Sequence, residues 1–187
     1  ISWTGATPGG LRVSWRFDVQ QRARADDAAL KPMAMQQGDE TRKKTVTTDL
    51  AFNANGVVRM RSDNKATKPS TPKTFSFPGL LDLPSALLLI RSEPLTQGAV
   101  YRFVVYPATN GYLATVTVAG RDSMKVGAGT YQAIKLDLQL SKVNKQRKLE
   151  PHKKFRQASA WLPDDPHRLP LRIDARGFVG TVFARPE

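Results

Sequence analysis

Apolar and polar residues alternate at every second position along much of this chain. The pattern is clearest over residues 11–19 and 134–140, where apolar side chains are separated by charged or polar ones. Successive side chains of a β-strand point to opposite faces of a sheet, so this period predicts strands with one buried and one solvated face. It therefore favours an antiparallel, mainly β structure.

Strand patterns recur at the spacing of hairpins, with turn signals between them. Turn signals occur at residues 53–56, 110–111 and 127–129, because Asn and Gly tolerate positive φ. Polar residues 21–44, with a break at Lys31-Pro32, are interpreted either as a loop or as a loop with paired strand ends on either side. Residues 62–74, rich in Lys, Pro, Ser and Thr, are interpreted as a mobile loop. The expected strands are 11–19, 46–52, 58–61, 100–106, 114–118, 134–140, 155–162, 171–173 and 179–183. Strands at this spacing predict a curved antiparallel sheet that forms a partial barrel.

One short helix is expected in the middle of the chain. Asp82 or the pair Pro84-Ser85 can start it, residues 86–90 continue it, and Pro94 ends it. A helix of about ten residues is not stable alone, so it has to pack on the sheet. The apolar run at residues 86–90 is far shorter than the roughly 20 residues that cross a bilayer, so no membrane-spanning helix is expected.

The residue types that most catalytic and metal sites require are scarce. The 187 residues include no cysteine, which excludes disulfides, thiolate metal sites and a Cys nucleophile. His152 and His167 lack partners at metal-ligand spacing, and no nucleophile elbow or phosphate-binding loop is present. Asp164 and Asp165 lie in a Pro-bounded segment and are interpreted as turn formers. We therefore expect a non-catalytic protein without metal or cofactor.

Positive charge is the strongest compositional signal. Lys and Arg total 29 against 16 Asp and Glu, a net charge of +13, which favours either anionic partners or a soluble basic protein without a specific use for the charge. The segment 142–156 is either a hairpin tip that contacts anionic lipid or lipopolysaccharide, or a solvated hairpin that resists aggregation. Phe155 is its only aromatic residue, which makes stacking on nucleic-acid bases poor. Its cations are Lys142, Lys145, Arg147, Lys148, Lys153, Lys154 and Arg156.

Three segments in the second half resemble the DUF3108 family of bacterial proteins. Residues 81–98 contain D-x-x-S-A-L-x-x-x-R followed by L-x-x-G. Residues 116–135 are similar to the family's hairpin around A-G-T-F, and residues 160–173 to its closing W…R-x-P-V-R-I segment. Asp122 replaces the usual Glu, Gly127 the usual Pro, Tyr131 the usual Phe, and Pro163 a small polar residue. The resemblance is good over residues 77–183, whereas residues 1–76 fit only by their strands and turns.

The resemblance implies a single DUF3108-like β domain over residues 1–187, with a fold like the half-barrel clamshell of lipoprotein carriers. It also implies export to the periplasm or cell envelope, and the first residue, Ile1, fits either a removed secretory signal or a trimmed fragment. The leading hypothesis is a lipidic or apolar ligand in the concave face of the sheet. The alternatives are a polyanion-binding module that uses residues 142–156, or a scaffold that pairs its sheet edge with a partner.

Several motif residues also have structural interpretations. Asp82 starts the helix, and Gly98 and Gly129 supply turns. The dipole at the C-terminus of the helix favours a cation at Arg91, and the alternative role of this residue is anion binding. Trp161 is expected in the core. Arg168 and Arg172, on either side of Pro170, are expected to face solvent from an edge strand.

Overall fold

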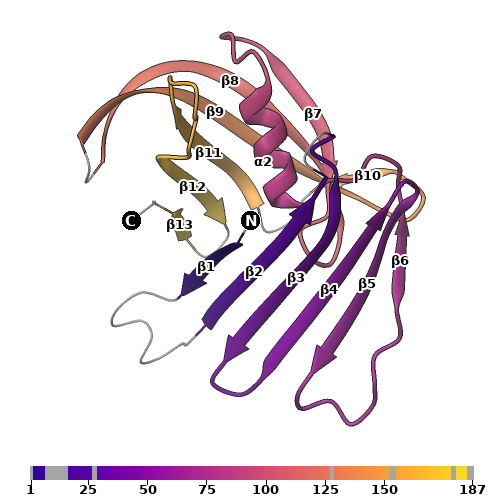
Figure 1. Cartoon of the computed structure of the whole chain (residues 1–187). Helices are drawn as coiled ribbons and strands as arrows, with labels where there is room; N and C mark the ends of the chain where they lie inside the picture. The colour runs from indigo at the N-terminus through magenta and orange to yellow at the C-terminus, as the bar shows by residue number, and fades with distance from the viewer. Residues whose placement is uncertain are drawn as a thin grey trace. The chain divides into compact units, whose positions relative to one another are not determined.

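The computed structural model describes residues 2–6, 17–26, 29–126, 129–151, 155–177 and 180–184. Within these residues the protein is mainly β, with two antiparallel sheets, one short helix and no closed barrel (Figure 1). The predicted mainly β fold with antiparallel pairing and a single short helix is confirmed, whereas the predicted half-barrel curvature stays a prediction. The chain divides into two compact units, residues 1–86 with 105–111, and residues 87–104 with 112–187.

The first unit contains a six-stranded sheet in which neighbouring strands follow the order of the chain (Figure 1). Its strands are β1 (Ser2–Ala6), β2 (Phe17–Ala25), β3 (Pro32–Thr41), β4 (Thr45–Asn53), β5 (Gly56–Asp63) and β6 (Lys73–Ser76). The predicted hairpin at residues 46–61 is confirmed as β4 and β5. Asn53 Oδ1 accepts a hydrogen bond of 2.9 Å from the Asn55 N–H, and Gly56 follows with a positive φ of 150°.

The interpretation of residues 21–44 as a loop is wrong. β2 continues to Ala25, and β3 pairs with it in antiparallel register. The apolar period is hidden here because the buried face of the hairpin carries Gln21 and Ala23 beside Met35. β1 and β6 were also not predicted, and residues 11–16 of the expected first strand lie outside the described residues.

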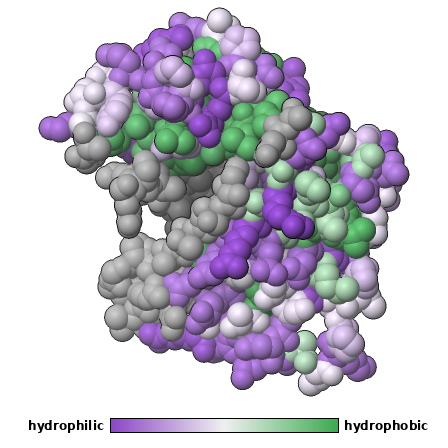
Figure 2. All heavy atoms as spheres, viewed as in Figure 1, coloured by the Kyte–Doolittle hydropathy of each residue, from purple (hydrophilic) through white to green (hydrophobic). Residues whose placement is uncertain are grey.

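One face of the first sheet is buried and the other is open. Met35 and Leu50 are 2% exposed and Val57 is 1% exposed, and these residues alternate with exposed or half-buried ones on the opposite face. Tyr106 belongs to the same unit, and its ring lies 5.4 Å from the ring of Phe75 on β6. The visible surface of the molecule is mainly hydrophilic, interrupted by apolar patches (Figure 2).

The second sheet has the order β13-β12-β11-β9-β8-β7, with β10 paired to β9. Its strands are β7 (Val100–Val105), β8 (Gly111–Val126), β9 (Gly129–Val143), β10 (Leu149–Pro151), β11 (Phe155–Pro163), β12 (Arg172–Gly177) and β13 (Gly180–Ala184). The strands predicted after residue 99 are confirmed within the described residues, although β8 and β9 are longer than expected. Residue 179 of the last expected strand lies outside the described residues. β10 was missed because it has only three residues and lies within the basic segment.

The helix α2 (Leu83–Ser92) lies where the sequence predicts it. Asp82 caps its first turn: Oδ1 accepts the Ser85 N–H at 2.7 Å, and the Asp82 carbonyl accepts the Ala86 N–H at 3.0 Å. No helix among the described residues is long and apolar enough to span a membrane.

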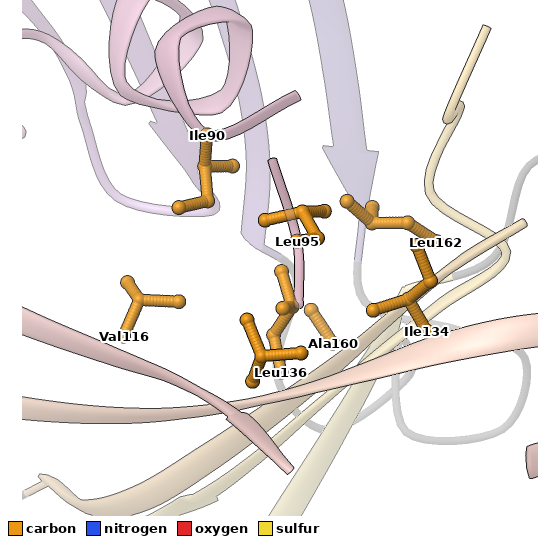
Figure 3. Close-up of a cluster of buried hydrophobic side chains, with 8 residues drawn as sticks. Ile90, Leu95, Val116, Ile134, Leu136, Ala160 and Leu162 are labelled. Atoms are coloured by element: carbon orange, nitrogen blue, oxygen red, sulfur yellow. The ribbon is translucent and has the colours of Figure 1, made fainter. Parts of the chain in front are cut away.

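The helix packs on the second sheet, as its short length requires. The side chain of Ile90 points from α2 toward the apolar residues of the strands (Figure 3). Ile134 and Leu162 of the same cluster are fully buried. The buried cluster consists of Ile90, Leu95, Val116, Val118, Ile134, Leu136, Ala160 and Leu162.

Candidate functional site

A shallow trough lies on the open face of the first sheet. Strand register aligns two rows of side chains across β2 to β5, one running from Arg22 to Met60 and the other from Arg24 to Val58. The hollow over these rows has a volume of about 460 Å³. We call this site the trough; it is lined by Arg22, Arg24, Ala34, Gln36, Asp49, Ala51, Val58 and Met60, with Met35 and Leu50 also bordering it.

The trough arises from a difference in side-chain length across the sheet. Ala34 and Ala51 are cross-strand neighbours on the two central strands, so the floor between them is low and apolar. Arg24 on β2 and Val58 on β5 continue the same row to either side with larger side chains. Met60, 39% exposed, adds apolar surface beside them. The result is an apolar floor with a higher rim.

The polar groups of the trough are unevenly distributed. Gln36 Nε2 donates a hydrogen bond of 2.8 Å to Asp49 Oδ1, which engages this carboxylate in the middle of the sheet. Arg22 and Arg24 both lie on β2, so the two guanidinium groups belong to one side of the trough. Arginine binds carboxylate and phosphate groups through two parallel hydrogen bonds. An apolar floor beside two arginines suits a ligand with an apolar body and an anionic end.

Sequence reasoning missed the trough because half of its lining comes from residues 21–44. Once this segment is treated as a loop, Arg22, Arg24, Ala34 and Gln36 have no common face. The available signal was the spacing of the two arginines, which places both on the same side of a strand. The volume of the trough falls within the range of about 300–1,000 Å³ that small-molecule sites occupy.

The structure gathers part of the predicted basic segment in one hairpin. Lys142 lies at the end of β9 and its Nζ is 3.9 Å from Glu150 Oε2, whereas Lys145, Arg147 and Lys148 are exposed in the turn before β10. Lys153 and Lys154 lie outside the described residues, as does His152, and the Arg156 side chain is also outside them. The hairpin that both interpretations of the segment required is present.

Arg168 is not a solvent-facing residue of an edge strand, so that prediction is wrong. Its guanidinium Nη1 donates hydrogen bonds to the carbonyls of Arg91, at 2.8 Å, and Glu93, at 2.6 Å, at the C-terminus of α2. Arg91, in the last helical turn as expected, donates in return from Nε to the His167 carbonyl at 3.0 Å. Asp165 Oδ1 accepts the N–H groups of His167 and Arg168, so this acidic residue is a turn former.

Two further expectations about the closing motif are wrong. Trp161 is half-buried rather than in the core, and its ring lies between Lys135, whose Nζ is 5.9 Å from the ring centroid, and Arg172, whose Cζ is 5.5 Å from it. Arg172 lies on β12, which pairs with strands on both sides and is not an edge. Arg172 also makes two hydrogen bonds of 2.6 Å to Asp174, which raise the pKa of its guanidinium.

The remaining motif residues have structural roles. Gly98 and Gly129 have positive φ values of 84° and 143°, which suit the turns predicted there. Pro170 is half-buried and precedes Leu171, whose N–H donates to the Trp161 carbonyl at 2.8 Å. Burial raises the pKa of the Asp82 carboxyl, although the hydrogen bond from the Ser85 N–H opposes the shift. No group of three or more potential metal ligands comes together within the described residues.

The described residues form a mainly β protein of two antiparallel sheets, with a shallow trough on the open face of the first sheet. The chain belongs to the DUF3108 family, described as a protein of unknown function, and the match covers residues 1–185. This confirms the resemblance seen at residues 77–183 and extends it over the first sheet. No curated protein and no solved structure shows significant similarity to the chain.

Proposed function

We propose that this protein binds a lipidic ligand in the trough of its first sheet, without catalysing a reaction. The apolar part of the ligand lies over Ala34, Ala51 and Val58, and its anionic group pairs with Arg22 and Arg24. The observation that carries the proposal is the alignment of an apolar floor with two arginines on the open face of the sheet. We place this activity in the periplasm or cell envelope, following the expectation attached to the family resemblance.

The two parts of the trough contribute differently to binding. Apolar contact yields about 25 cal/mol for each Å² removed from water, so the floor supplies most of the affinity for an acyl chain. An ion pair at an exposed arginine contributes only about 0.2–1 kcal/mol, because water screens it. The arginines therefore orient the ligand and distinguish an acid from a neutral analogue.

The contribution of the apolar floor to ligand binding is tested by covering the floor with a larger side chain. Ala51 is exposed on the open face, so Ala51→Phe raises the floor without entering the core, and Phe is well tolerated in a strand. We expect the affinity for a fluorescent fatty acid, measured by titration, to fall at least about tenfold, the equivalent of about 1.4 kcal/mol. Thr45→Phe is the matched control, because Thr45 is exposed on the same face at the other end of β4. Equal binding by the two variants would remove the trough from consideration.

The arginines are tested by changing the head group. Arg24→Gln is expected to weaken binding of a fatty acid about two- to fivefold, and to leave binding of the fatty alcohol of equal length unchanged. Arg102→Gln, which removes an exposed arginine of β7 outside the trough, is expected to change neither. If Arg24→Gln weakened binding of acid and alcohol equally, the anionic end of the ligand would lie elsewhere.

A further inference from the structure

We infer that the turn between β9 and β10 docks the protein on an anionic phospholipid bilayer. This surface, which we call the hairpin tip, consists of Lys145, Arg147, Lys148 and Leu149. It shares no residue with the trough, and the inference does not depend on ligand binding there. The sequence analysis left open several anionic partners for the basic segment. The inference selects one of them, an anionic phospholipid bilayer.

The hairpin tip is an ordered turn. Asn144 organises it: Oδ1 accepts the N–H groups of Gln146, at 3.0 Å, and Lys148, at 2.9 Å, and Nδ2 donates to Glu150 Oε1 at 2.9 Å. The backbone closes the turn with a hydrogen bond of 3.0 Å from the Asn144 N–H to the Lys148 carbonyl. A surface already held in this form loses little conformational entropy when it binds.

The hairpin tip presents an apolar side chain among its cations. Leu149 is 57% exposed, although it pairs in register with Val143, which is only 2% exposed. Val143 and Leu149 therefore share one apolar face of the hairpin. This face is buried at Val143 and exposed to solvent at Leu149. A leucine of this kind, beside basic residues, can enter the boundary between head groups and acyl chains of a bilayer.

The charge of the hairpin tip complements an anionic surface. Residues 141–151 contain four cations and one acidic residue, Glu150, so the segment carries a net positive charge. Lys145, Arg147 and Lys148 follow one another within the turn and are all exposed. Each cation near an anionic membrane contributes roughly 1 kcal/mol of binding free energy, which raises the affinity about fivefold. The hairpin tip contains three such cations.

A bilayer fits this surface better than a nucleic acid does. Residues 141–151 contain no aromatic side chain on which a base could stack, so phosphate contacts alone would remain. Leu149 would gain nothing from such contacts, because a phosphate backbone offers it no apolar environment. At a bilayer, by contrast, the leucine and the cations act together.

The experiment is flotation of the purified protein with phosphatidylcholine vesicles that contain 30% phosphatidylglycerol, compared with pure phosphatidylcholine vesicles. The triple variant Lys145→Gln, Arg147→Gln, Lys148→Gln is expected to lose about a hundredfold in affinity for the anionic vesicles. The control variant Lys65→Gln, Lys68→Gln, Lys73→Gln makes the same change in net charge at exposed positions of the first unit. It is expected to float like the unaltered protein.

The contribution of the leucine is tested separately with Leu149→Ser. This change keeps every charge, and we expect at least a fivefold loss in affinity for anionic vesicles with no change in retention on heparin. A surface that binds polyanions by charge alone would show no effect of Leu149→Ser. That result, or equal loss in the two triple variants, would overturn the inference, as would stronger binding to DNA or lipopolysaccharide than to the vesicles at equal salt.

Discussion

The sequence neighbours of Trp161 on β11 determine which face of the sheet its side chain occupies. Ala160 and Leu162 belong to the buried cluster under α2, so strand alternation places Trp161 on the opposite face. There its ring meets Lys135 and Arg172 from the two neighbouring strands, at distances typical of cation–π contacts. The expectation of a core position followed from the size of the Trp161 side chain. The alternation of side chains along the strand instead places Trp161 on the face opposite Ala160 and Leu162.

Asp82 yields a prediction about pH. Burial raises the pKa of its carboxyl above the ordinary value of 3.8, so the folded protein holds the proton more tightly than the unfolded chain does. The stability that this group contributes is complete below the unfolded pKa and is lost as the pH rises through the folded pKa. Asp82→Asn keeps an oxygen for the Ser85 N–H and cannot ionise. We expect its free energy of unfolding, relative to the unaltered protein, to increase from acid to neutral pH.

Urea unfolding of both proteins between pH 3.5 and pH 8, values chosen to start below about 3.9 and end well above it, measures this difference. Asp82→Ala is the control that removes the cap, and it should be about 1 kcal/mol less stable than Asp82→Asn throughout the same range, because neither side chain ionises. A difference between Asp82→Asn and the unaltered protein that stays constant with pH would show that Asp82 does not titrate differently on folding.

At the scale of elements, the end of α2 and the turn before β12 hold each other through reciprocal hydrogen bonds. Arg168 donates to the carbonyl of Arg91, in the last turn of the helix, and to the carbonyl of Glu93, just after it. Its positive charge also suits the C-terminal dipole. Arg91 donates to the turn in return. These contacts lie within the second unit and fix the helix that covers its core.

Arg168→Asn tests the contribution of this arginine. The backbone of Arg168 has a φ of 47°, which Asn tolerates, so the substitution removes the guanidinium without straining the turn. We expect the free energy of unfolding to fall by about 1–3 kcal/mol, because hydrogen bonds from a charged donor are lost at a partly buried site. Amide hydrogen exchange should accelerate in the last turn of α2. A loss no larger than that of Arg102→Gln would show that the helix end needs no such cap.

The hairpin of β2 and β3 shows where sequence reasoning stops. Its period is regular, but the buried positions include Gln21, which hydrogen-bonds to Gln37 at 3.2 Å across the strands. Apolar patterning cannot find a strand whose inward face uses paired amides. By contrast, the second sheet was predicted nearly completely, because rows such as Ile134 to Leu140 alternate without exception.

At the scale of the whole molecule, period-two patterning predicted the fold class but not the number of sheets. Alternation describes each strand by itself, whereas the partition into two sheets depends on which strands pair, and that information is not local in sequence. The trough was lost for the same reason, since its rows need the register of four strands. The basic segment, by contrast, could be identified from the sequence, because charge density is read directly from it, and its role in binding stays a prediction.

The prediction of a single domain can be tested by cooperativity. Leu50 in the first unit and Leu162 in the second are buried to 2% and 0% exposure. We expect Leu50→Ala and Leu162→Ala each to cost about 2–5 kcal/mol and to shift one shared unfolding transition. Two transitions in calorimetry, each moved by only one of the substitutions, would contradict a single cooperative domain.

The open face of the first sheet carries the trough, while Met35, Leu50 and Val57 on the reverse face carry its apolar packing. Substitutions at Arg24, Ala51 and their neighbours on the open face therefore carry little penalty in folding. Under the proposed binding of a lipidic ligand, such substitutions would change specificity while the architecture stays constant. Among relatives, we expect the trough to vary in sequence more than the layer behind it.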